Sequence, residues 1–380
     1  MNNPDLLLIL CSRLDNDTLR ALSLNPVLWP VISEVIKSQY FWYLRTQDLV
    51  GRELVQRPGR DWKSAHYLLE GTLIHKKNRT IEEKSKYTRE ILRNLLAVEV
   101  LLELGFDPSV EDNYAIGIAS EKGHTEVVRL LLQDKRIDPT AGDNYAIRWA
   151  SEKGRTEVVR LLLQDKRVDP SDDDNSSIES ASENGHTEVV RLLLQDKRVD
   201  PSTDEDNWPI RWASEKGHMD VIKLLLQDKR VDPSSDDNSA VRLASEYGHT
   251  EVVRLLLQDK RVNPSADHNS AIELASKNGH IDAVGLLLQD KRVDPSANHD
   301  SSIRLASEYG HIDIVRLLLQ DKRVDPSNDY NSAINLASKY GHIGVVRLLL
   351  QDERVGGSSV DGDYLLYQAS KSNRGRHPSS

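Results

Sequence analysis

The chain is poor in the residues that build one thick core or brace it covalently. Its 380 residues include one cysteine, two methionines and two phenylalanines. Because Cys11 stands alone, no disulfide forms within the chain, which favours a reducing, intracellular compartment such as the cytoplasm. Hydrophobic residues make up 38% and charged residues 29%. That balance is typical of helical arrays in which many thin layers replace a single core.

Long apolar runs and an excess of positive charge are missing as well. No stretch approaches the roughly 20 apolar residues of a membrane helix. The short run from Leu6 to Cys11 follows an acid, Asp5, where a signal peptide carries basic residues. The formal net charge is −10, so the chain lacks the clustered lysines and arginines that neutralise nucleic-acid phosphates. We therefore expect neither a membrane nor a nucleic acid as partner.

Motifs of catalysis and cofactor binding are also missing. The sequence has no phosphate-binding loop, no dinucleotide-binding glycine pattern, no zinc-protease motif and no nucleophile elbow. It therefore predicts no enzyme and no cofactor. Ligands of one zinc lie within roughly 2 Å of the metal, whereas stacked helices lie roughly 8–10 Å apart. We therefore expect no metal site, and turn residues bonded to backbone, at the recurring His124, His186, His218, His249, His280, His311 and His342, where Arg155 takes one place.

What the chain has in abundance is an internal repeat. The phrase "EVVRLLLQDKRVDPS" occurs verbatim at 157–171 and again at 188–202. Glycines in the frame "SE.GH" or its variants recur every 31 residues, with one interval of 32. They mark eight units, with a partial unit at 97–109 before them and a degraded one at 369–373 after them. These glycines are Gly123, Gly154, Gly185, Gly217, Gly248, Gly279, Gly310 and Gly341.

One unit shows the local structure that the repeat predicts. Asn238 or Ser239 is expected to cap a first helix, because a short polar side chain accepts a bond from an orphan backbone N–H. Gly248 is expected to end that helix, since glycine tolerates a positive φ. A second helix follows His249. Its apolar stripe is formed by Val253, Leu256 and Leu257 and widened by Val252 and Leu255.

A helix, a glycine turn, a second helix and a polar turn at this period resemble the ankyrin repeat. The resemblance is carried by the "GH" turn, the "EVVRLLL" helix and the "VD" or "VN" that follows it, from about Leu95 to Asn373. The units open with "NSAI", "NYAI" or "NWPI" in place of the family's "TPLH", and they are about two residues short. The resemblance implies an all-α ankyrin solenoid of about eight full helix-turn-helix units, with short turns and little or no β-ladder.

Residues 1–72 do not follow the period and resemble an F-box domain. The matching features are Pro4, Trp29 and the segments "LLLIL", "TLRALSL" and "FWYLR", while "NPVLW" lacks the cysteine and basic residue common before the family's central tryptophan. An unrelated helical cap for the solenoid is the alternative. The resemblance implies binding to a Skp1-type linker of a cullin ubiquitin ligase, with the candidate residues Leu7, Leu10, Leu14, Leu19 and Trp29.

The sequence thus divides into an F-box-like head at 1–72, a charged connector at 73–94, the repeat array at 95–373 and a disordered tail at 374–380. This combination resembles the F-box and ankyrin proteins of large DNA viruses, which implies the cytoplasm of a host cell.

Acidic and aromatic residues distinguish the third and fourth units. In a solenoid the copied positions build the frame, and the varying positions carry specificity. One first-helix position reads Trp149, Ser180, Trp212 and then Leu243. A serine between tryptophans indicates either a notch that anchors a partner side chain or large residues packed over a small one. The resemblance places varying positions on a concave binding face, where the candidates are Trp149, Asp172, Asp173, Asp174, Glu179, Glu183, Asp204, Glu205, Asp206, Trp208, Trp212 and Tyr247.

These observations predict a non-catalytic adaptor that acts as a monomer. The array would hold a target protein, and the head would bring a Skp1 and cullin ubiquitin ligase to it, which raises the local concentration of the target. The alternative is an ankyrin scaffold that sequesters or bridges a partner without recruiting a ligase.

Overall fold

The computed structural model describes Thr46, Lys63, Ala65, His66 and the residues 93–103, 106–202, 206–356 and 361–374. All regular elements in these residues are helices, so the prediction of an all-α array with little or no β-ladder is confirmed there. The head candidates and two of the acids lie outside the described residues, namely Leu7, Leu10, Leu14, Leu19, Trp29, Asp204 and Glu205.

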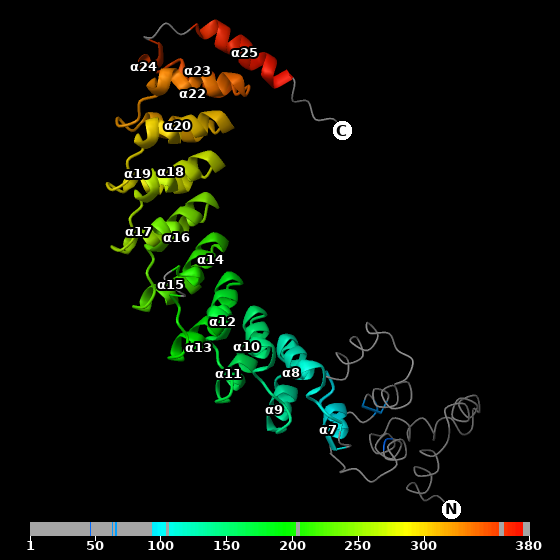
Figure 1. Ribbon diagram of the computed structural model, residues 1–380. Coiled ribbons are helices and arrows are strands. Elements are labelled where there is room, and N and C mark those ends of the chain that lie inside the picture. The colour runs from blue at the N-terminus through cyan, green and yellow to red at the C-terminus, as the bar shows by residue number, and fades with distance from the viewer. Residues whose placement is uncertain are drawn as a thin grey trace, which may run out of the picture. The chain divides into compact units, whose positions relative to one another are not determined.

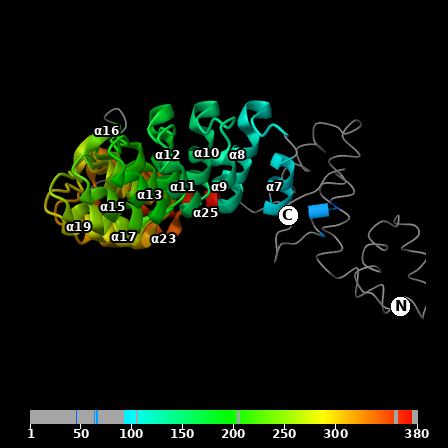
Figure 2. The ribbon, with the colours of Figure 1, turned by 90° about the horizontal axis from the view of Figure 1, so that it is seen from below.

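The chain forms two compact units. The first comprises residues up to Ala150 together with Arg155–Asp169, and the second comprises Ser151–Gly154 and all residues from Pro170. In the first unit, α8 and α10 lie in one row and α9 and α11 in a second row (Figure 2). The helices that begin in this unit are α7 (Leu95–Glu103), α8 (Val110–Lys122), α9 (Thr125–Gln133), α10 (Ala141–Glu152) and α11 (Thr156–Leu163).

The second unit also stacks its own helices in two rows (Figure 1). The first helices of successive repeats contact one another, and so do the second helices. The first helices are α12 (Asp172–Glu183), α14 (Trp208–Lys216), α16 (Ser235–Glu246), α18 (Ala266–Asn278), α20 (Ala297–Tyr309) and α22 (Asn328–Lys339). The second helices are α13 (Thr187–Gln195), α15 (Met219–Gln227), α17 (Thr250–Gln258), α19 (Ile281–Gln289), α21 (Ile312–Leu319) and α23 (Ile343–Leu349).

A C-terminal helix closes the second unit. After the short α24 (Glu353–Gly356), α25 (Gly362–Arg374) packs against both α22 and α23. The buried hydroxyl of Ser338 donates to the carbonyl of Leu365 at 2.7 Å. The segment at 369–373 therefore belongs to a helix that covers the last repeat.

Each first helix except α14 starts with a left-handed turn of three residues. In α16 the residues Asp236, Asp237 and Asn238 have φ between 47° and 59°, and the N–H of Asn238 donates to the carbonyl of Ser234 at 3.0 Å. Asparagine and aspartate enter this backbone region more easily than other residues with a side chain. This explains the Asp- and Asn-rich openings of the repeats. The right-handed helix begins where the sequence predicts. The predicted cap at Asn238 or Ser239 is wrong, because Asn238 accepts the N–H of Asn263 and the buried Ser239 hydroxyl makes no hydrogen bond among the described residues.

The core is a thin layer between the two helices of a repeat and their neighbours. In α17, Val252, Val253 and Leu256 are at most 2% exposed, whereas Leu255 and Leu257 are half-buried. All five predicted positions are therefore buried or half-buried, with Val252 more buried than the sequence predicts and Leu257 less. Each repeat adds a buried valine or isoleucine after its second helix, such as Val262.

Glycine and histidine of the "GH" turns join neighbouring repeats. Nε2 of His186, His218, His249, His280, His311 and His342 lies 2.7–2.9 Å from a backbone carbonyl of the preceding repeat. A carbonyl only accepts, so Nε2 carries the proton in each ring. Arg155 replaces a histidine and makes the same bond through Nε, at 2.8 Å from the carbonyl of Glu121. The prediction of turn histidines bonded to backbone is confirmed at these six positions.

Two separate features of the structure require glycine in the turn. Gly248 has a φ of +74°, and a Cβ atom there would lie 2.7 Å from Cε1 of His280 in the next repeat. The sequence indicates only the first requirement, the positive φ. The second is the close approach of the next histidine ring.

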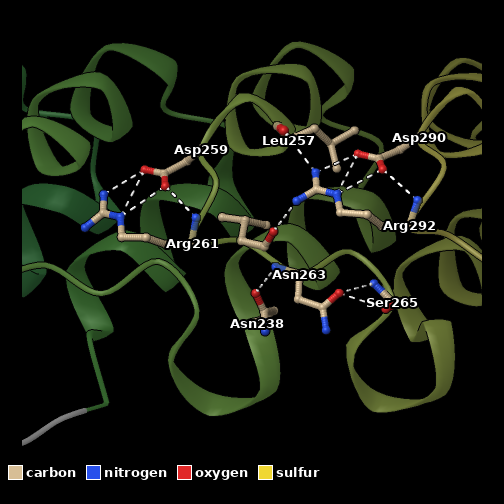
Figure 3. A network of polar contacts seen from close by, with 9 residues as sticks. Asn238, Leu257, Asp259, Arg261, Asn263, Ser265, Asp290 and Arg292 are labelled. Carbon is tan, nitrogen blue, oxygen red and sulfur yellow. Dashed lines mark hydrogen bonds and ion pairs between the residues drawn. The ribbon is translucent and has the colours of Figure 1, made fainter.

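Two further side chains bond each repeat to its neighbour (Figure 3). Arg292 forms a two-pronged pair with Asp290, and its Nη1 donates to the carbonyl of Val262, one repeat back, at 2.7 Å. Asn238 accepts the N–H of Asn263, one repeat ahead, at 2.6 Å. We call the recurring histidine, arginine and asparagine positions the frame residues. Their bonds end on main-chain atoms of the adjacent repeat.

Candidate partner-binding surface

The surface formed by the left-handed turns and the first helices, here called the first-helix face, carries the residues that vary between repeats. On the opposite row, the second helices mostly repeat one exposed pair, such as Glu251 with Arg254 at 3.3 Å. In the exit turn, Arg261 pairs with Asp259 and also donates to the carbonyl of Val231 in the preceding repeat, so this ion pair belongs to the frame. Residues with individual chemistry therefore gather on the first-helix face.

In the second unit, α14 presents an aromatic cluster formed by Trp208, Arg211 and Trp212. The two indole rings stack with centroids 5.5 Å apart and an interplanar angle of 20°. The guanidinium carbon of Arg211 lies 4.0 Å from the centroid of Trp208, within the range of a cation–π contact. All three residues are half-buried, so they combine a fixed geometry with access from solvent.

Arginines of the first helices pair with aspartates of the following left-handed turn. Arg211 lies 2.9 Å from Asp236, and Arg242 lies 4.0 Å from Asp267. Arg304 repeats this arrangement with Asp329 at 3.6 Å. Such part-exposed pairs contribute about 0–1 kcal/mol, so their role is to orient the guanidinium groups. The Nε–H groups of all three arginines are buried and have no acceptor among the described residues.

Glu273 interrupts this series of arginines. It occupies the equivalent first-helix position in α18, and burial raises the pKa of its carboxyl group. One oxygen, Oε1, is buried without a hydrogen bond in the described part of the chain. The first-helix face of the second unit therefore carries buried Nε–H groups and one carboxylate oxygen that make no hydrogen bond among the described residues, while Ser301 and Asn298 hydrogen-bond to the Glu273 carboxyl group.

The first unit has a different surface because Gly117 stands where other repeats carry a long side chain. The ring of Tyr145 covers this glycine, and a Cβ atom at Gly117 would lie 2.8 Å from Cδ1 of that ring. Tyr145 also contacts Trp149, with ring centroids 4.6 Å apart. A cavity of about 190 Å³ opens here between the left-handed turns of α8 and α10.

A family model for three copies of the ankyrin repeat matches residues 89–174, 170–237, 210–299 and 272–361. The matches together cover well over half of the chain. The chain belongs to the ankyrin-repeat family. A search of curated proteins found no match to this chain.

Members of this family are in general modules that bind proteins, and the array is an interaction scaffold. Among the described residues, no three histidine, cysteine, aspartate or glutamate side chains come close enough to hold a metal ion. Every helix in the described part of the chain is too short or too polar to cross a lipid bilayer.

The predicted acidic patch lies on the left-handed turns and first helices of the ankyrin array. Asp173, Asp174 and Asp206 are exposed. Asp172, Glu179 and Glu183 are half-buried, and Asp172 accepts the N–H of Asp173 at 3.0 Å. These residues share a surface, and their contact with a partner stays a prediction.

The predicted notch combines residues of the two units. Trp149 belongs to the first unit, whereas Ser180 and Trp212 belong to the second. Within its own unit each tryptophan rests on an aromatic ring one helical turn earlier, Tyr145 or Trp208. Both tryptophans are therefore ordered by local contacts, and the notch itself stays a prediction.

Tyr247, a candidate residue of the binding face, is exposed. It is 50% exposed, and Tyr309, at the equivalent position of a later repeat, is 48% exposed. Tyr340 is half-buried, with Nζ of Lys339 lying 5.1 Å from its ring centroid.

Sequence reasoning missed the first-helix arginines and the cavity beside Gly117. An available signal was the position six residues before each turn glycine, which reads Gly117, Arg148, Glu179, Arg211, Arg242, Glu273, Arg304 and Asn335. Apart from the glycine, every residue there is charged or an amide, which is typical of a solvent-facing contact position.

Proposed function

We propose that this protein is an adaptor whose ankyrin array holds a target protein on the first-helix face. The observation that carries the proposal is the cluster of Trp208, Arg211 and Trp212 on α14. Tryptophan and arginine are the residues that most often dominate binding energy at protein interfaces. Here they are oriented by stacking and by the ion pair with Asp236, and none of them belongs to the frame.

The experiment exchanges the two tryptophans for the residues of the next repeat, Ser239 and Leu243. Proteins recovered from cells with tagged full-length chain are quantified for the wild type and for the Trp208→Ser, Trp212→Leu variant. We expect at least one bound protein to fall about 30-fold, which corresponds to about 2 kcal/mol.

The matched control removes two exposed aromatics elsewhere. Tyr364 and Tyr367 of α25 are 58% and 57% exposed, and their replacement by serine is expected to leave the bound proteins unchanged. If no protein depends on the tryptophan pair more than on this tyrosine pair, the proposed target site is wrong.

The finer part of the proposal is that the head recruits a Skp1-type linker. It is supported by the F-box-like sequence of residues 1–72 alone. Full-length chain titrated with purified Skp1 in calorimetry is expected to bind with a Kd on the order of 1 μM. The Leu7→Arg, Leu10→Arg variant is expected to lose that binding. Absence of heat at about 50 μM chain contradicts ligase recruitment.

The scaffold alternative makes the opposite prediction in cells. The target would be held but not degraded, so its abundance would be the same with the wild-type chain and with the Leu7→Arg, Leu10→Arg variant. A target that accumulates only with the variant supports the adaptor.

A further inference from the structure

The first two repeats differ from the others at positions that surround one cavity. Tyr114 and Tyr145 stand where five later repeats carry Ser176, Ser239, Ser270, Ser301 and Ser332. Gly117 stands where other repeats carry Arg148, Arg211, Arg242 and Arg304. The cavity is thus bordered by two tyrosine rings. It lacks the first-helix arginine that four of the other seven repeats carry at the position of Gly117.

The fourth repeat shows what an arginine does at this position. Arg211 is equivalent to Gly117, and Trp208 is equivalent to Tyr114. The Arg211 guanidinium lies over the Trp208 ring at 4.0 Å and forms an ion pair of 2.9 Å with Asp236. An aromatic face and a carboxylate together hold the group. At Gly117 no side chain rises from the helix, the residue equivalent to Asp236 is Gly142, and the ring of Tyr145 lies over the glycine.

The size of the cavity fits one side chain. Its volume is about 190 Å³, close to the roughly 150 Å³ cavity that holds a benzene molecule. Pockets for drug-sized ligands measure roughly 300–1,000 Å³. Ile116 and the two tyrosines supply apolar and aromatic lining, which suits the stem and planar head of an arginine.

The charge around the cavity selects a cation. Glu111, Asp112 and Asp138 belong to its lining, which includes no lysine or arginine. Hydrogen bonds from Thr140 lower the pKa of the Asp138 carboxyl group, so it is ionised at neutral pH. The positive charge of Arg167 also lowers the pKa of the Asp138 carboxyl group. Its guanidinium, however, is bonded to Asp165 and to the carbonyl of Ile137.

We propose that this cavity takes an arginine side chain of the bound protein, which lies beside the Tyr145 ring that covers Gly117. The guanidinium stacks on the tyrosine rings and faces the carboxylates of Glu111, Asp112 and Asp138. The inference rests on the proposed function, because it requires that the array holds a protein. It adds the chemistry of one anchor, an exposed arginine on that protein.

The test measures binding of a blocked pentapeptide, Gly-Gly-Arg-Gly-Gly, to the full-length chain by saturation-transfer NMR. A single buried side chain is expected to give a Kd on the order of 1 mM. Two analogues have citrulline or lysine in place of arginine. Citrulline keeps the shape without the charge and is expected not to bind. Lysine cannot stack as a plane and is expected to bind several-fold more weakly.

Variants built from the chain's own repeats locate the site. Gly117→Arg displaces the Tyr145 ring and puts a guanidinium group of the chain itself beside the cavity, so it is expected to weaken peptide binding at least tenfold. Gly285→Arg is the matched control, because Gly285 stands where other second helices carry an arginine and a Cβ atom there has only Leu317 within 4 Å, at 3.9 Å. It is expected to change nothing.

Two further variants keep the test valid if Gly117→Arg does not fold. Tyr114→Ser with Tyr145→Ser removes the rings, and Glu111→Asn, Asp112→Asn, Asp138→Asn removes the charge while keeping residues that suit left-handed turns. Both are expected to abolish binding at unchanged helicity by circular dichroism.

The inference is overturned if citrulline or lysine binds as tightly as arginine, or if the arginine peptide does not bind at about 20 mM. It also fails if the ring and charge variants bind the peptide normally. The proposed function is tested separately, because loss of the target from the Trp208→Ser, Trp212→Leu variant does not involve this cavity. A target held equally by the wild type and by Gly117→Arg leaves the proposed function standing and rejects the arginine anchor.

Discussion

At the scale of single residues, the frame position of Asn238 is filled by an acid in one repeat only. Asp300 takes this place and is 2% exposed. Its carboxylate accepts the N–H of Asp325 at 2.8 Å and the side-chain amide of Asn328 at 2.7 Å. Burial nevertheless raises the pKa of the carboxyl group. An amide would make the main-chain bond without a buried charge.

We expect Asp300→Asn to increase the free energy of unfolding at neutral pH by about 1 kcal/mol, the usual scale of a single buried polar change. A raised folded pKa means that the native chain binds more protons than the unfolded one. Wild-type stability therefore falls as pH rises from about 3.8 through the folded pKa of Asp300. Urea unfolding at pH 7 and pH 4 measures the gain, which should shrink at the lower pH.

The reciprocal change provides the control. Asn269 fills the same position one repeat earlier, is 7% exposed and accepts the N–H of Asp294 at 2.7 Å. Asn269→Asp is expected to destabilise the array at pH 7 and less so at pH 4. Equal effects of both changes at the two pH values would show that burial of the charge is unimportant.

Turn glycine and histidine also act as a pair. Gly248→Ala is expected to lower the free energy of unfolding by more than 2 kcal/mol, because a left-handed alanine costs roughly 1–2 kcal/mol and its Cβ atom would also overlap His280. In a His280→Ala background only the backbone cost remains. A double-mutant cycle by urea unfolding measures the coupling, and a coupling of zero would mean that the histidine ring moves away freely.

At the scale of elements, the exit turn after each second helix binds two repeats together. Asp290 and Arg292 form a planar pair, and hydrogen bonds from the Arg292 guanidinium hold the pKa of the Asp290 carboxyl group below its usual range. The same guanidinium reaches the carbonyls of Val262 and Leu257 at 2.7 and 3.1 Å. A fork of several donors is needed to make all of these bonds.

Arg292→Lys is therefore expected to destabilise the array by about 1–2 kcal/mol, since an ammonium group cannot serve the carboxylate and both carbonyls. Thermal and urea unfolding measure the change. The neighbouring Lys291 is exposed and has no role in the frame. Its replacement by alanine is expected to stay within about 0.5 kcal/mol. Similar losses of unfolding free energy in the two variants would show that the hydrogen-bond geometry of the Arg292 guanidinium group does not stabilise the array.

At the scale of the whole molecule, the spacing of the frame bonds makes the repeat a removable unit. Deletion of residues 239–269 joins Asn238 to Ser270 and restores every frame bond in register. We expect this variant to fold with unchanged mean helicity and a modest loss of stability, because an array's stability is approximately a sum over repeats and their interfaces. Circular dichroism and urea unfolding test this.

A deletion two residues shorter, 239–267, leaves the frame out of register at the junction. It is expected to unfold in two separate transitions or to lose helicity there. If both deletions behave alike, register is not set by the frame bonds.

Much of the fold can be predicted from the sequence, because a position with an unusual backbone conformation accepts only certain residue types. Gly248 is an example: its positive φ demands glycine, and the helix ends there. The bonds between repeats are not readable in the same way. Asn238 and Arg292 bond to main-chain atoms, which have no residue identity, so no second residue in the sequence marks the contact. The sequence consequently predicts a helix cap at Asn238 or Ser239, although Asn238 bonds to the neighbouring repeat.

The candidate site is readable only in part for a related reason. Trp208 and Trp212 stand out as rare residues in a repeated context. The cavity beside Gly117 arises from a missing side chain, and its shape depends on where the ring of Tyr145 lies. Rotamers of surface rings follow from packing and not from sequence spacing. The sequence therefore shows that Gly117 is exceptional but does not show that a cavity forms beside it.

The frame residues hold neighbouring repeats through atoms that every amino acid shares. Substitutions on the first-helix face at positions other than the frame residues therefore leave the frame bonds between repeats intact. Mutations that alter partner preference and mutations that alter folding fall on separate sets of positions. A lineage carrying this protein can thus change what it recognises at little risk to the scaffold, which is the condition under which a binding surface keeps pace with a changing target.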